Sequence, residues 1–123
     1  MPRKKRFQES LKIAMRGAME ASLNERNLKI QWMVSIVVIV AGGFFQLQMW
    51  EWCFLILSIG AVLSAETMNT AIESLVDLLE PEQHESARKA KDFAAGSVLL
   101  ISIAACVIGL LIFGNHVLLL LKA

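Results

Sequence analysis

Hydrophobic and polar positions divide the chain into a mixed N-terminal segment and three long apolar runs. No Asp, Glu, Lys or Arg occurs in residues 30–50, 52–65 or 93–121. A helix that crosses a bilayer needs about 20 mostly apolar residues. The first and third runs meet this length, and the second does so if its helix continues inward past Glu66. The pattern predicts three transmembrane helices, at about residues 28–48, 51–79 and 87–120.

The segment before the first run, at about residues 6–24, has a different pattern. Phe7, Leu11 and Met15 recur with a helical period, whereas Lys12 and Arg16 lie away from that apolar face. This pattern predicts an amphipathic surface helix in the head-group plane, and a solvated helix packed on the bundle is the alternative. The expected fold is an all-α membrane protein, with three transmembrane helices and a surface helix in a single domain of residues 1–123.

Composition and charge agree with a membrane location. The chain has 123 residues, of which 56% are hydrophobic, and residues 34–45 lack the polar face that a helix of a soluble bundle should have. Basic residues are concentrated before the first run and at residues 88–91, whereas the turn at residues 46–51 has none. The positive-inside rule therefore predicts a cytoplasmic N-terminus and an outer C-terminus. Basic residues without interleaved aromatic residues favour a lipid surface over nucleic acid.

Glu66 is the candidate functional residue, because it follows an uncharged run at the edge of a predicted span. Hydrocarbon cannot solvate a carboxylate, so such residues usually mark a catalytic, transport or ion-binding site. Asn69, Glu73 and Asp77 follow Glu66 at helical spacing and therefore face the same way. We call Glu66, Asn69, Glu73 and Asp77 the polar stripe. The predicted topology places it at the cytoplasmic end of its helix.

The residue types of the polar stripe suit a divalent cation that prefers oxygen ligands. Lys91 and Asp92 open the third span at the same membrane level, and Glu25 closes the segment leading to the first. Carboxylates and one lysine at a single boundary are typical of a site for magnesium-bound phosphates. The alternative is that interfacial carboxylates only pair with Arg88 and Lys89, or are solvated, as we expect for those of the loop at residues 80–85.

Other residues give weaker signals. Cys53 and Cys106 fall in different spans and are interpreted as small apolar fillers. His84 could contact phosphate or be an ordinary loop histidine, and His116 is interpreted as structural. The sequence contains no GxxxxGK[ST] loop, GxGxxG turn or HRD-type catalytic loop, so it lacks the motifs of soluble nucleotide-binding enzymes.

Three sequence segments carry a resemblance to a known family. They are Asn24-Glu25, ETMNTAIESLVD at residues 66–77 and AKDFAAG at residues 90–96. Together they resemble the small bacterial integral-membrane lipid kinases, the diacylglycerol kinase and undecaprenol kinase family, over nearly the whole chain. The resemblance implies a homotrimer of three-helix protomers in the bacterial cytoplasmic membrane. Its active sites are expected between protomers at the cytoplasmic face.

The resemblance also implies roles for individual residues. Glu66 matches the catalytic base, which takes the proton from the lipid hydroxyl that attacks the γ-phosphate of ATP. Glu25 and Glu73 match the ligands of Mg²⁺. Nucleotide-contacting positions comprise these two carboxylates together with Arg6, Asp77, Glu82, His84, Lys91 and Asp92. The substrate site comprises Glu66, Asn69 and Ala95, and Asn69 and Asp77 are also expected to orient their neighbours.

The expected lipid substrate rests on two short segments that resemble one branch of this family. The segments at residues 24–29 and 51–56 resemble the undecaprenol kinase branch, so undecaprenol is the expected substrate, with diacylglycerol as the alternative. A small membrane transporter or a non-catalytic assembly subunit is the alternative of another class. Small residues at 94–97 would let the third helix approach another closely, and three helices alone would leave the carboxylates facing lipid. Both points predict a homo-oligomer.

Overall fold

The computed structural model describes residues 3–79, 82 and 84–123, and these form four helices in chain order. They are α1 (Arg3–Asn24), α2 (Arg26–Phe45), α3 (Met49–Leu79) and α4 (Glu85–Lys122). No bound differs by more than three residues from the range expected from the sequence. The described residues contain no strand, so the prediction of an all-helical protein is confirmed.

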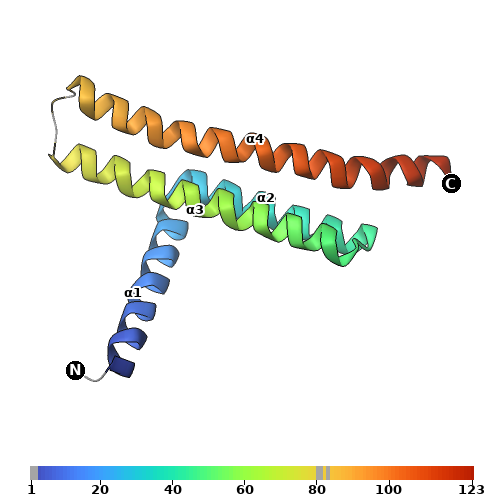
Figure 1. The fold of residues 1–123 in the computed structure, drawn as a ribbon, viewed down its shortest axis with the longest axis horizontal. Helices are drawn as coiled ribbons and strands as arrows, with labels where there is room; N and C mark the ends of the chain where they lie inside the picture. Colours follow the sequence, from blue (N-terminus) through green and yellow to red (C-terminus); the bar gives the residue numbers. More distant parts are fainter. Residues whose placement is uncertain (1–2, 80–81, 83) are drawn as a thin grey trace.

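The three apolar helices α2, α3 and α4 run in nearly the same direction, and α1 leaves them at a steep angle (Figure 1). Helices α2, α3 and α4 are each long and apolar enough to cross a membrane. The most extensive contact is between α3 and α4, which form an antiparallel hairpin, and α2 packs mainly on α3. The direction of α1 is compatible with a helix in the membrane plane, which stays a prediction.

The turn between α2 and α3 is closely packed. Gln46 caps α2 in the left-handed conformation, with φ at 52°. The Leu47 N–H donates to the Gly42 carbonyl oxygen at 3.3 Å, and the Gln46 N–H donates to that of Gly43 at 3.4 Å, a pattern that satisfies the last carbonyls of the helix. A Cβ at Gly42 would lie 2.7 Å from the Trp52 ring. Only glycine allows this approach of α2 to α3.

A buried polar pair joins α3 and α4 beside this turn. His116 Nε2 lies 3.0 Å from both carboxylate oxygens of Glu51. Glu51 also accepts the backbone N–H of Gln48 at 2.8 Å, as a glutamate in the first turn of a helix commonly does. The Phe45 ring lies 5.8 Å from the imidazole and covers the pair from α2. The interpretation of His116 as structural fits this contact, but its partner was not expected.

Most apolar side chains of the single chain remain exposed. Among the described residues, Leu28 is the most deeply buried large side chain, at 1% exposure, and Leu47, Leu55 and Ile112 form a small buried cluster. The exposed residues of α2 and α4 are largely Val, Ile and Leu. Exposed apolar surface of this extent marks a face for lipid or for other helices.

An apolar groove of about 640 Å³ lies between α2 and α4, with α3 as its floor. Val38, Ile59 and Phe113 are among its lining residues, and Ser35 and Ser58 add hydroxyl groups. Each of these serines donates to a carbonyl of its own helix at 2.7 Å. The groove therefore presents an almost wholly apolar surface.

Candidate functional site

The polar stripe runs along α3 from a buried end to an exposed end. Glu66 is 5% exposed and Asn69 is 7% exposed, whereas Glu73 is partly buried and the Asp77 side chain is 64% exposed. The expectation that three helices alone leave the carboxylates facing lipid is therefore wrong for Glu66, and Asn69 is buried with it. Their own chain covers them, because both lie on the α3 face that packs against its neighbours.

Asn69 connects the buried part of the polar stripe to Glu73. Its Nδ2 donates to Glu73 Oε1 at 3.2 Å, one helical turn along α3. Its Oδ1 is buried and has no hydrogen-bond partner among the described residues. A buried polar atom without a partner is costly, so this oxygen is free to accept a hydrogen bond. The arrangement fits the predicted role of Asn69 as a residue that orients its neighbour.

Lys91 brings α4 to the exposed end of the polar stripe. Its Nζ lies 2.8 Å from Asp77 Oδ1, and its side chain is 27% exposed. The pair places one positive charge within a group of carboxylates, as a site for phosphate requires. The structure therefore brings together Lys91, Asp77 and, through its position on the same helix face, Glu73.

The other charges at the start of α4 pair with one another. Arg88 Nη1 lies 2.8 Å from Asp92 Oδ2, and Lys89 Nζ lies 3.7 Å from Glu85 Oε1, both at a spacing of four residues on one helix. These groups are largely exposed, so the pairs contribute little to stability. Pairing with Arg88 and Lys89 thus accounts for Asp92 and Glu85, but not for the polar stripe. Asp92 lies on a different face of α4 from Lys91.

The remaining predicted site residues are exposed side chains on other parts of the chain. Glu25 precedes α2 without a side-chain capping bond, and Arg6 lies in the part of α1 that points away from the bundle (Figure 1). Ala95 is exposed on α4. Glu82 and His84 lie before α4, where the His84 N–H donates to the Glu82 carbonyl at 2.9 Å. The other loop residues, 80, 81 and 83, lie outside the described residues.

No group of three or more His, Cys, Asp or Glu side chains within the described residues is arranged to hold a metal ion. Mg²⁺ commonly takes only one or two carboxylates and completes its ligands with water and substrate phosphates. The donor chemistry of Glu73 and Glu25 fits a metal that arrives together with a nucleotide.

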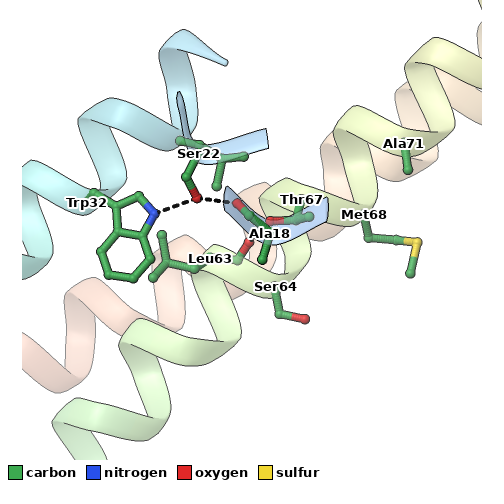
Figure 2. A pocket seen from close by; sticks show the side chains of 9 residues that line it. Ala18, Ser22, Trp32, Leu63, Ser64, Thr67, Met68 and Ala71 are labelled. Carbon is green, nitrogen blue, oxygen red and sulfur yellow. Dashed lines mark hydrogen bonds between the residues drawn. The ribbon is translucent and has the colours of Figure 1, made fainter. Parts of the chain in front are cut away.

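A pocket of about 410 Å³ lies between α1, α2 and α3, at the level of Glu66 but on another face of α3 from the polar stripe (Figure 2). Thr67, the chain neighbour of Glu66, is one of its lining residues, and the rest are mostly apolar. Trp32 Nε1 donates to Ser22 Oγ at 2.9 Å, and Ser22 Oγ donates to the Ala18 carbonyl at 2.7 Å. These bonds tie α2 to α1 at the mouth of the pocket.

The pocket was not expected from the sequence. Ser22 and Trp32 are ten residues apart on two helices, and nothing in a single sequence shows that their side chains meet. Thr67 could have been suspected, because it is adjacent to Glu66. Its hydroxyl donates to the Leu63 carbonyl at 2.8 Å, a bond that a helix offers to any threonine.

Comparison with known proteins gives a consistent result. Residues 12–113 match the family described as prokaryotic diacylglycerol kinase. The chain is 41% identical to an undecaprenol kinase of Bacillus subtilis over 108 residues, which cover 88% of each protein. It is 39% identical to a diacylglycerol kinase of Synechocystis over 81% of this chain and 58% of that protein. It is 27% identical to a diacylglycerol kinase of Escherichia coli over 82% of this chain and 83% of that protein.

Proposed function

The chain belongs to the prokaryotic diacylglycerol kinase family, and we propose that it transfers the γ-phosphate of ATP to the hydroxyl of a membrane lipid alcohol. The observation that carries this proposal is the polar stripe. It places a buried carboxylate at one end and exposed charges at the other, within a helix that is apolar enough to span a membrane. A lipid hydroxyl and a nucleotide can meet along such a helix. Membership of a kinase family decides against a transporter or a non-catalytic subunit.

Glu66 is the proposed catalytic base. It is the most deeply buried carboxylate of the polar stripe, and it lies one helical turn after Val62, which lines the apolar groove between α2 and α4. A base must reach the hydroxyl whose proton it takes, at about 2.6–3.2 Å or through one water. A lipid alcohol in this groove would bring its hydroxyl towards the buried end of the stripe. Asn69, with its unpartnered Oδ1, is placed to accept a hydrogen bond from the same group.

The nucleotide is proposed to bind at the exposed end. Lys91 and Asp77 form a pair there that can open towards phosphate, and Glu73 lies one turn nearer to Glu66. We assign Mg²⁺ to Glu25 and Glu73, and the metal would neutralise phosphate charge during transfer. Arg6, Glu82, His84 and Asp92 are proposed contacts of the nucleotide on the basis of the family resemblance.

Undecaprenol is the proposed lipid, and diacylglycerol is the alternative. The relative that is 41% identical over 88% of its length is an undecaprenol kinase, and the diacylglycerol kinases that the chain matches are 27–39% identical. Both lipids offer a hydroxyl at the end of a long apolar group. The apolar groove between α2 and α4 offers a surface for such a group within the membrane.

A homotrimer with sites between protomers is proposed for two reasons. The single chain leaves wide apolar faces on α2 and α4, including the small residue Ala95. In addition, Asp92 lies on a different face of α4 from Lys91, so its proposed contact with nucleotide is better explained by the polar stripe of a neighbouring chain.

The concentration of basic residues before α2 and at the start of α4 supports an N-terminus and a site on the cytoplasmic side.

The catalytic role of Glu66 can be tested in purified protein reconstituted with undecaprenol or diacylglycerol, Mg²⁺ and radiolabelled ATP. Wild-type protein should phosphorylate undecaprenol faster than diacylglycerol. Glu66→Gln keeps the size of the side chain but cannot accept the proton, so its rate should fall by at least about 100-fold. The Glu66→Gln variant should retain its affinity for the nucleotide. Glu9→Gln on the exposed α1 is the matched control. Lipid phosphorylation near the wild-type rate in Glu66→Gln would rule out Glu66 as the base.

Magnesium dependence tests the assigned ligands. Glu25→Gln and Glu73→Gln each remove one negative oxygen, so each variant should need a higher Mg²⁺ concentration for half-maximal activity. Glu85→Gln, which removes an exposed carboxylate paired with Lys89, should leave the titration unchanged. Wild-type magnesium titrations in both Glu25→Gln and Glu73→Gln would show that these residues do not hold the metal.

Mixed oligomers test whether two chains share a site. Glu66→Gln and Asp92→Asn should each be inactive alone, and co-refolding them in equal amounts should rebuild roughly a quarter of the sites by random assortment. Wild-type protein mixed with the double variant is the matched control. It should retain roughly a quarter of its sites if they are shared and roughly half if each chain is complete. Absence of regained activity in the first mixture, with half retained in the second, would refute a shared site.

A further inference from the structure

The buried pair of Glu51 and His116 lies at the opposite end of the α3–α4 hairpin from the polar stripe. The Glu51 side chain is 5% exposed and that of His116 is 18% exposed. Both carboxylate oxygens lie within 3.0 Å of the imidazole nitrogen, and one also accepts the Gln48 N–H. Because these groups are far from the polar stripe along the helix axis, they have no part in the proposed chemistry itself.

Two polar pairs join α3 to α4, namely Glu51 with His116 and Asp77 with Lys91. The number of residues between the two pairs is almost the same on both helices. Asp77 follows Glu51 by 26 positions on α3, and His116 follows Lys91 by 25 positions on α4. At 1.5 Å per residue these distances are about 39 Å and 38 Å. Both pairs can therefore form in the same relative position of two antiparallel helices. Sliding one helix by a full turn would move the partners by about 5.4 Å and break both contacts.

Packing between the two polar pairs is apolar. The buried α4 residues there are Ala94 and Ile112, and Ile112 belongs to the same buried apolar cluster as Leu55 of α3. Apolar surfaces tolerate repacking, whereas a polar pair in an apolar interface has a sharp distance requirement and can fix the register of two helices. A buried ion pair adds little net stability, because desolvation offsets most of its attraction.

We propose that Glu51 and His116 are positioning residues that fix the register of α4 on α3, and thereby hold Lys91 against Asp77 at the nucleotide end of the site. This inference rests on the proposed function, since it concerns how the nucleotide end of the polar stripe is assembled. It assigns a role in catalysis to two residues at the far side of the membrane-spanning bundle. Neither residue touches a substrate.

Steady-state kinetics of reconstituted variants can distinguish this role from simple destabilisation. Glu51→Gln and His116→Leu should each raise the KM for ATP several-fold and leave the KM for the lipid unchanged, because the displaced group is Lys91. The double variant should be no worse than either single one, since both remove the same contact. His116→Lys offers Glu51 a hydrogen-bond donor in place of the imidazole and should restore the KM for ATP. A loss of folded protein alone would lower kcat without changing either KM, and this result would overturn the proposal.

A distance measurement tests the register without relying on activity. Spin labels are placed at Leu78→Cys and Phe93→Cys, both exposed in the chain, in a background with Cys53→Ser and Cys106→Ser. Unlabelled protein is added in excess, so that only the distance within one chain is measured. Glu51→Gln should displace or broaden the distance distribution, and His116→Lys should leave it as in the parent.

The two measurements separate this inference from the proposed function. Superimposable distance distributions in the parent and in Glu51→Gln would overturn the register role, whatever the activity. If the wild-type chain phosphorylates no lipid, the proposed function fails. A displaced distribution in Glu51→Gln would then still support the register role of the pair.

Discussion

The polar stripe is the constraint on which the rest of the structure depends, because hydrocarbon cannot solvate its carboxylates and amide. An unpaired charge in a membrane is costly, so such groups must be covered by protein or reach water. The chain uses both solutions along one helix. Glu66 and Asn69 are buried by the packing of α3, and Asp77 reaches the exposed end, where Lys91 pairs with it. The α3–α4 hairpin is the scaffold that holds this change from buried to exposed polar side chains along α3.

The change from buried to exposed side chains along the stripe suits a reaction between a lipid-soluble substrate and a water-soluble one. In the proposed reaction, a lipid alcohol would approach from the apolar groove between α2 and α4, whose lining residue Val62 lies one turn from Glu66 on the same face. The nucleotide would approach from water, where Lys91 and Asp77 are accessible. Asn69 and Glu73 lie between these ends and are joined by a hydrogen bond. The distance between the two environments is thus spanned by three turns of one helix, without any of the phosphate-binding loops of soluble kinases.

Much of the fold could be predicted from the sequence, because its strongest signals are local. The length of the apolar runs gave the spans, and the spacing of Glu66, Asn69, Glu73 and Asp77 placed them on one face. What could not be predicted depends on how separate helices meet. The contact of Glu51 with His116 and that of Trp32 with Ser22 need the relative positions of two helices.

The direction of Asp92 was likewise hidden, although its neighbour Lys91 was correctly placed at the level of the stripe. Adjacent residues on a helix point about 100° apart, so only the packing of α4 decides which of the two faces α3. The burial of Glu66 was misjudged for the same reason. A single sequence does not reveal how closely small residues such as Ala94 let α4 approach.

The central claim is that Glu66 accepts the proton of a lipid hydroxyl at a site completed by nucleotide and metal. It is tested most directly by an experimental structure of the full chain in a bilayer mimic, with undecaprenol and a magnesium-bound, non-hydrolysable ATP analogue. The account predicts the lipid hydroxyl about 2.6–3.2 Å from the Glu66 carboxylate and the γ-phosphate on the side of Glu73 and Lys91. A lipid hydroxyl bound away from Glu66, with the nucleotide in place, would contradict it.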